Sequence, residues 1–188
     1  MHYSGIEPCD ILNGTGFRTV IWVSGCSIGC KGCFNPNTHN PNYGKEYTQE
    51  AQKYLLECLS KDYIDGITIT GGNPLESYNL DTVLSLIKEV RLSYPEKTIW
   101  LYTGFRWSEL TQYNDYHGTI PLSSYLRKDV YDLYNKRLNI IKNIDILVDG
   151  EYIDEQRDVT LKWRGSSNQR VIDVQQTLTQ NKIVLYCD

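Results

Sequence analysis

Three cysteines within eight positions carry the clearest chemical signal in this sequence. Cys26, Cys30 and Cys33 form a C-x3-C-x2-C run. Thiols with this spacing could share one buried face of a helix. However, a glycine stands immediately before each cysteine, and each glycine inside a helix costs about 1 kcal/mol relative to alanine. The sequence therefore favours a loop, in which glycine lets backbone N–H groups approach sulfur closely.

Such a loop could hold either of two metal groups. Three thiolates together with His39 would complete a Cys3His zinc site. Alternatively, the thiolates would hold three corners of a [4Fe–4S] cluster and leave one iron open to a substrate. Zinc knuckles are commonly built from C-x2-C hairpins, so the C-x3-C spacing favours iron–sulfur. The isolated cysteines are Cys9, Cys58 and Cys187, and Cys58 lies on the apolar face of an expected helix, as a core thiol does.

Composition indicates a globular chain with a hydrophobic core. Of its 188 residues, 40% are hydrophobic, and 19 Lys and Arg stand against 23 Asp and Glu. This balance argues against a nucleic-acid binder, which needs a basic excess to neutralise phosphates. No apolar run approaches the roughly 20 residues that span a membrane, and the N-terminus does not resemble a signal peptide. We therefore expect a cytoplasmic protein in which thiols stay reduced.

Short β-branched runs alternate with helical patterns along the chain, which is typical of βα units over a parallel sheet. Strands are expected at 17–23, 66–70, 98–102, 144–148, 171–174 and 183–186. Thr48 and Asn79 are expected N-caps of two helices, and 122–138 has a helical pattern. We interpret 1–188 as a single domain with a helical insertion at about 105–143.

Three polar segments directly follow predicted strands: the cysteine loop, the Gly71–Pro74 turn and the Thr103–Gly104 pair. The C-terminal ends of parallel strands lie at one edge of a sheet, so these segments would gather on one rim. A closed eight-unit barrel needs about 250 residues. The expected fold is therefore α/β, an incomplete (β/α) barrel with parallel strands and helices outside, whose open side could admit a large partner.

The cysteine run, with a Gly-Gly turn after the second predicted strand, resembles the signature of the radical S-adenosylmethionine (SAM) superfamily. More narrowly, the sequence is similar to the activating enzymes of anaerobic (class III) ribonucleoside-triphosphate reductases. The matching stretches are 8–14, 23–26, 32–35, 70–75, 99–104, 147–150 and 163–169. They run in order through most of the chain, and only 105–143 looks longer than the connection usual in the family.

This resemblance implies an enzyme that reductively cleaves SAM at a [4Fe–4S] cluster and generates a glycyl radical on the reductase. A flavodoxin-like protein would donate the electron. The cluster ligands it implies are Cys26, Cys30 and Cys33. The SAM-binding residues it implies are Gly32, Phe34, Asn35, Gly71, Gly72, Asn73 and Thr103. The alternatives are an activase of another glycyl-radical enzyme and a Cys3His zinc-binding protein-interaction module.

Two of the implied SAM contacts have a simpler structural interpretation, and a third departs from the pattern of the family. Thr103 could simply end a strand before Gly104, and Asn35 could only form a turn with Pro36. Asn73 stands where relatives usually carry Asp or Glu. An Asn carbonyl still accepts a hydrogen bond from an ammonium, but without the charge-assisted part. We therefore expect Asn73→Asp to tighten SAM binding.

Overall fold

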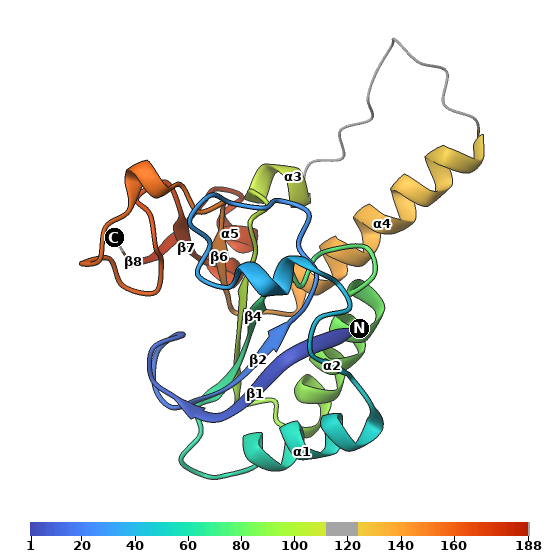
Figure 1. Ribbon diagram of the computed structural model, residues 1–188, viewed down its shortest axis with the longest axis vertical. Helices are drawn as coiled ribbons and strands as arrows, with labels where there is room; N and C mark the ends of the chain where they lie inside the picture. The colour runs from blue at the N-terminus through green and yellow to red at the C-terminus, as the bar shows by residue number, and fades with distance from the viewer. Residues whose placement is uncertain (112–123, 188) are drawn as a thin grey trace.

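The computed structural model describes residues 1–111 and 124–187, which contain one open eight-stranded sheet (Figure 1). The strand order is β3–β1–β2–β4–β5–β6–β7–β8. The strands are β1 (His2–Asp10), β2 (Arg18–Val23), β3 (Lys45–Glu46), β4 (Gly66–Gly71), β5 (Thr98–Tyr102), β6 (Ile146–Asp149), β7 (Arg170–Asp173) and β8 (Leu185–Cys187). The helices are α1 (Gln49–Leu59), α2 (Leu80–Ser93), α3 (Trp107–Thr111), α4 (Ser124–Lys142) and α5 (Val174–Gln180), with 3-10 turns η1 (Pro36–His39) and η2 (Asp154–Gln156).

The four central strands, β2, β4, β5 and β6, pair in parallel. Parallel neighbours need a crossover connection, and α1 and α2 lie in the two crossovers that join β2 to β4 and β4 to β5. Both edges of the sheet are antiparallel: β1 pairs with β2 and β3, and β7 pairs with β6 and β8. The expected α/β class is confirmed, whereas the expectation of parallel strands holds only for the centre of this mixed sheet.

All six predicted strands are present, whereas β1 and the two-residue strand β3 were not predicted. Thr48 caps α1 as predicted, because its Oγ1 accepts a hydrogen bond from the Ala51 N–H at 3.4 Å. Asn79 precedes α2 as predicted, but its side chain does not cap the helix. Its amide instead donates to backbone carbonyls of two earlier loops. The described part of the predicted 122–138 helix belongs to α4.

The two faces of the sheet are buried in different ways, since side chains alternate along a strand. One face packs on the helices in a large core that includes Ile69 of β4, Leu55 of α1 and Ile87 of α2. The other face carries a smaller cluster, made of Trp100, Ile146, Val148 and Val171 with Tyr102, Trp163 and Cys187 packed against it. Burial on both faces explains the almost continuous hydrophobic runs of the central strands.

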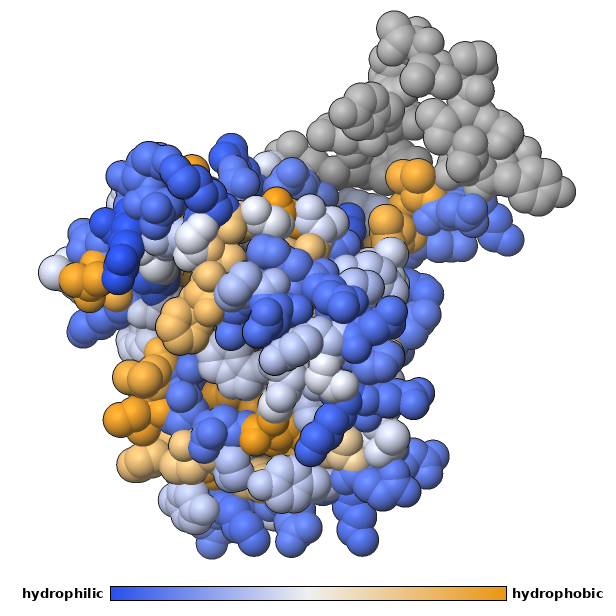
Figure 2. All heavy atoms as spheres, viewed as in Figure 1, coloured by the Kyte–Doolittle hydropathy of each residue, from blue (hydrophilic) through white to orange (hydrophobic). Residues whose placement is uncertain are grey.

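The surface is mainly hydrophilic in the view of Figure 2, with separate hydrophobic patches. The most exposed large hydrophobic side chains are Phe34, Leu92, Val159 and Leu12. Within the described ranges, no helix combines the length and the hydrophobicity that crossing a membrane requires.

Candidate metal and cofactor site

The cysteine loop and the Gly71–Pro74 turn lie against each other at the C-terminal ends of β2 and β4. The Gly72 N–H donates to the Val23 carbonyl, and the Asn73 N–H donates to the Gly25 carbonyl, both at 2.7 Å. The end of β5 joins them, since Thr103 Oγ1 donates to Asn73 Oδ1 at 2.9 Å. The prediction that the three segments gather on one rim is therefore confirmed.

The cysteine run is an irregular loop, as its glycines predicted. The glycines before the three cysteines all have positive φ, with values of 96°, 64° and 72° in chain order. A side chain at these positions would be strained, because L-residues seldom adopt this backbone region. The glycines thus fold the chain so that each cysteine follows a left-handed residue.

Backbone N–H groups donate hydrogen bonds to two of the three thiols, Cys26 and Cys30. The three cysteines of the run are free and partly buried. Burial raises the pKa of Cys26, while hydrogen bonds from the backbone of Ile28 and Gly29 oppose this increase. Burial also raises the pKa of Cys30, and a hydrogen bond from the Tyr152 backbone opposes it. N–H donors of this kind stabilise thiolate, the form that ligates iron.

The donor set fits a cluster better than a single ion. Across residues 1–111 and 124–187, no three His, Cys, Asp or Glu side chains are arranged to hold one metal ion. A Cys3His site with His39 is therefore not assembled in this part of the chain. A [4Fe–4S] cluster takes each thiolate on a separate iron, so its ligands need not converge on one point. Three partly buried thiols, two of them with backbone N–H donors, suit that arrangement.

Close backbone packing explains the two glycines of the turn. A Cβ at Gly71 would lie 2.5 Å from the Val23 carbonyl oxygen, and a Cβ at Gly72 would lie 2.5 Å from the Gly25 carbonyl oxygen. Any larger residue would push the turn away from the cysteine loop. The contact of Gly71 and Gly72 with the SAM amino group stays a prediction.

Asn73 and Thr103 are both buried, with exposed fractions of 0% and 5%. Asn73 Oδ1 accepts hydrogen bonds from Thr103 Oγ1 and from the Leu75 N–H, the latter at 3.1 Å. Asn73 Nδ2 is buried and has no hydrogen-bond partner among the described residues. Thr103 Oγ1 also accepts from the Phe105 N–H at 3.2 Å. These two side chains therefore join the turn to the end of β5.

The other predicted SAM contacts lie at the far end of the loop. Phe34 is 90% exposed. The Asn35 carbonyl accepts from the N–H and from Oγ1 of Thr38, which matches the turn interpretation of this residue. A Cβ at Gly32 would lie 2.9 Å from Asp154 Oδ1, so the loop packs closely on the segment after β6. Phe34 and Asn35 directly follow Cys33 in the chain, and their contact with SAM stays a prediction.

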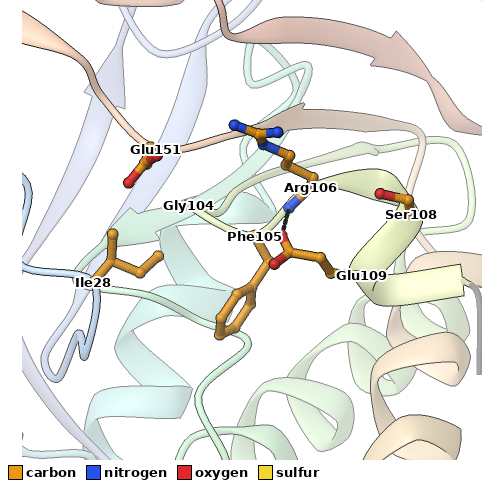
Figure 3. A pocket seen from close by; sticks show the side chains of 7 residues that line it. All are labelled: Ile28, Gly104, Phe105, Arg106, Ser108, Glu109 and Glu151. Atoms are coloured by element: carbon orange, nitrogen blue, oxygen red, sulfur yellow. Dashed lines mark hydrogen bonds between the residues drawn. The ribbon is translucent and has the colours of Figure 1, made fainter. Parts of the chain in front are cut away.

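A pocket of about 410 Å³ opens beside the cysteine loop (Figure 3). Its lining consists of Ile28, Gly104, Phe105, Arg106, Ser108, Glu109 and Glu151. A Cβ at Gly104 would lie 2.2 Å from Ile28 Cδ1, so this glycine lets the cysteine loop rest on the end of β5. Sequence reasoning missed Arg106 and Glu151, although both follow shortly after predicted strands.

Comparison with known proteins decides the family. The sequence matches the family described as "4Fe-4S single cluster domain" over residues 12–172. It is 37% identical over 172 residues to the anaerobic ribonucleoside-triphosphate reductase-activating protein of Enterobacteria phage T4, covering 91% of this chain and 93% of that protein. The chain belongs to the family of anaerobic ribonucleoside-triphosphate reductase-activating proteins. Other members of the family are the Vibrio cholerae protein, 36% identical over 90% of this chain and 96% of its own, and the Escherichia coli K12 protein, 32% identical over 91% and 97%.

Membership of the activating-protein family confirms the narrower resemblance, and the 4Fe-4S match supports an iron–sulfur cluster. The remaining cysteines are dispersed: Cys9 is exposed, Cys58 is buried in α1 as predicted, and Cys187 ends β8. For this member of the activating-protein family, the C-x3-C-x2-C loop is therefore the candidate cluster site.

Proposed function

We propose that this chain is a radical SAM activating enzyme. It reductively cleaves SAM at a [4Fe–4S] cluster and generates a glycyl radical on an anaerobic ribonucleoside-triphosphate reductase. The observation that carries the proposal is the C-x3-C-x2-C loop packed directly on the Gly71–Gly72 turn, in a chain whose relatives are named activating proteins. When bound, the cluster supplies one electron and an iron with an open coordination position.

The chain's own residues hold and orient the reactants. Cys26, Cys30 and Cys33 would hold three irons as thiolates, with backbone N–H groups on the sulfur atoms of Cys26 and Cys30. SAM would be held at this rim by the residues that the resemblance implies, which are Gly32, Phe34, Asn35, Gly71, Gly72, Asn73 and Thr103. The buried Asn73–Thr103 pair keeps the turn and the end of β5 in one rigid arrangement. Pre-organised groups of this kind lower the barrier, because little reorganisation is needed during reaction.

The fold supports a macromolecular target. The site lies at the C-terminal ends of β2, β4 and β5, in a sheet that stays open among the described residues, as in an incomplete barrel of the radical SAM type. The pocket beside the loop carries charged side chains, including Arg106 and Glu151, that a polypeptide could meet. We propose the reductase as that polypeptide, a flavodoxin-like protein as the electron donor, and the cytoplasm as the location.

Anaerobic reconstitution with iron and sulfide, followed by reduction with SAM present, tests this function. We expect release of 5′-deoxyadenosine and methionine, and a glycyl radical signal in electron paramagnetic resonance (EPR) only when the reductase is added. A radical formed on another glycyl-radical enzyme instead would redirect the target and leave SAM cleavage in place. Failure to bind iron under these conditions would overturn the proposal.

Replacement of one proposed ligand tests the site. We expect Cys30→Ala to abolish SAM cleavage, because a cluster with two protein ligands is lost or disordered. Cys9→Ala is the matched control, since Cys9 is exposed and lies outside the cysteine run. Iron content and 5′-deoxyadenosine are measured in both variants. Cleavage by Cys30→Ala at the wild-type rate would contradict the ligand assignment.

A further inference from the structure

A buried carboxylate holds the beginning of the cysteine loop. Glu76, which follows the Gly71–Pro74 turn, is 6% exposed. Its Oε1 accepts a hydrogen bond from the Ser27 N–H at 2.8 Å and another from Ser27 Oγ at 2.6 Å. Ser27 is the residue directly after Cys26. One carboxylate oxygen therefore fixes both the backbone and the side chain of the loop next to its first cysteine.

The same segment contacts the loop at two earlier positions. Asn79 Nδ2 donates to the Ser24 carbonyl at 3.0 Å and to the Asn73 carbonyl at 3.1 Å. The Tyr78 ring lies where a side chain on Gly25 would project, because a Cβ there would be 2.3 Å from the ring. Residues 73–79 thus pack against the cysteine loop and hydrogen-bond to it. Glu76 is the acidic residue among these contacts.

Glu76 differs from Glu155, another carboxylate that touches the loop. Glu155 pairs with Lys31 at 3.5 Å, but both side chains are largely exposed, at 70% and 82%. Among the described residues Glu76 forms no ion pair with a cation. The nearby Arg137 instead donates to the Leu75 carbonyl at 3.0 Å and lies over the Phe105 ring at 4.5 Å. Arg137 therefore attracts Glu76 only through space, and within residues 1–111 and 124–187 the carboxylate is buried beside the loop without a direct ion pair.

We propose that Glu76 is a positioning residue with two effects on the cluster: its hydrogen bonds seat the cysteine loop, and its charge lowers the reduction potential. The inference rests on the proposed function, because it needs a cluster on Cys26, Cys30 and Cys33. A negative charge close to a redox centre opposes the arrival of an electron, and this repulsion is weakly screened where the charge is buried.

Two substitutions separate the two effects. Glu76→Gln keeps an oxygen that can accept from Ser27 but removes the charge. We expect a more positive midpoint potential in an EPR-monitored redox titration without SAM, and iron release to a chelator within twofold of wild type. Glu76→Ala removes the acceptor as well. Because a hydrogen bond to a charged group contributes about 1.5–3 kcal/mol, we expect iron release about tenfold faster or more.

Glu155→Gln is the matched control, because it neutralises the exposed carboxylate that pairs with Lys31 of the same loop; we expect neither the midpoint potential nor the iron release to change. In the protein without metal, faster amide hydrogen exchange at Ser27 in Glu76→Ala gives a readout independent of the cluster. An unchanged midpoint potential in Glu76→Gln would overturn the effect of the charge on the cluster. Unchanged iron release and hydrogen exchange in Glu76→Ala would overturn the role of the hydrogen bonds in holding the loop. If the wild type binds a cluster and cleaves SAM while these variants match it, only the role of Glu76 fails; if the wild type binds no cluster, the proposed function fails.

Discussion

The oxygen and the nitrogen of the Asn73 side-chain amide differ in their hydrogen bonding. Oδ1 has two donors, Thr103 Oγ1 and the Leu75 N–H, whereas Nδ2 is buried without a partner among the described residues. An unpaired buried donor costs stability unless a ligand or water meets it. The oxygen that sequence reasoning assigned to the SAM ammonium is thus already engaged within the protein. Asp at this position would keep that acceptor and add a second oxygen in place of Nδ2.

We expect Asn73→Asp to have opposite effects without and with SAM. Without SAM, the variant exchanges the unpaired neutral Nδ2 for an oxygen of a buried carboxylate, and burying a charge costs more than burying an amide. The free energy of unfolding should therefore fall by about 1–3 kcal/mol. The SAM ammonium can supply a charge-assisted donor, so SAM should bind more tightly to the variant and raise its Tm more. Urea unfolding of the apo-protein and calorimetry of the reconstituted protein measure the two effects. Asn37→Asp, at an exposed position, is the control; equal or weaker SAM affinity in Asn73→Asp would contradict the expectation.

Strands β2, β4 and β5 are tied together by Arg18, at the end of the sheet opposite the cysteine loop. Its guanidinium donates to Thr68 Oγ1 at 2.7 Å, to the Ile67 carbonyl at 2.6 Å and to the Thr98 carbonyl at 2.9 Å. It also lies 5.4 Å from the centre of the Trp100 ring. Burial lowers the pKa of Arg18 to about 10, which still leaves it protonated at neutral pH. One cation therefore fixes β2, β4 and β5 relative to one another at the ends opposite the site.

Replacement of Arg18 by Met should destabilise the whole sheet. The side chain of Met fills much of the space but takes the guanidinium donor away from two buried acceptors, Thr68 Oγ1 and the Ile67 carbonyl, at about 1–3 kcal/mol each. We expect the free energy of unfolding to fall by roughly 3 kcal/mol or more. Urea unfolding followed by circular dichroism measures it, and Arg157→Met, at an exposed arginine, should change it by less than about 0.5 kcal/mol. A loss of less than 1 kcal/mol in Arg18→Met would show that the strands align without it.

The elements that sequence predicted well are those with a strong local pattern. The central strands are buried on both faces, so their β-branched runs stand out from the helices between them. β1 was missed because its residues are mostly exposed or half-buried and have no clear alternation. It is held by pairing with β2 over most of its length and with only two residues of β3.

Local sequence patterns also predicted some parts of the site, whereas parts that depend on long-range contacts were missed. The cysteine loop and the Gly71–Gly72 turn were predicted because their residues are close together in the sequence. Glu76 and Asn79 were not, since their partners Ser27 and Ser24 lie 49 and 55 positions away. Asn79 also fits the residue preference of an N-cap. Only the structure shows that its amide instead donates hydrogen bonds to the Ser24 and Asn73 carbonyls.

At the scale of the whole molecule, the face of the sheet away from the helices is filled by aromatic side chains. Trp100 contacts Trp163 and Tyr186 edge-on, with ring centres 5.1 and 5.4 Å apart. These contacts join β5 to the segment before β7 and to β8. Tyr102 packs in the same cluster, and its hydroxyl is buried without a hydrogen-bond partner among the described residues. This face therefore buries the Tyr102 hydroxyl, and burial makes its ionisation unfavourable in the folded protein.

Stability should consequently fall at alkaline pH, and Tyr102→Phe should reduce that fall. Burial raises the pKa of Tyr102 above its usual value of 10. Above pH 10 the unfolded chain releases this proton while the folded protein keeps it, so the free energy of unfolding decreases by up to about 1.4 kcal/mol per pH unit. Without the hydroxyl this contribution disappears, and at pH 7 the variant should be as stable as wild type or more stable, because an unpaired buried polar group is removed. Urea unfolding at pH 7, 9 and 11 tests both points against Tyr63→Phe, at a tyrosine that is 60% exposed; a marked loss of stability at pH 7, or an unchanged alkaline slope, would show that the Tyr102 hydroxyl has a partner or ionises in the folded protein.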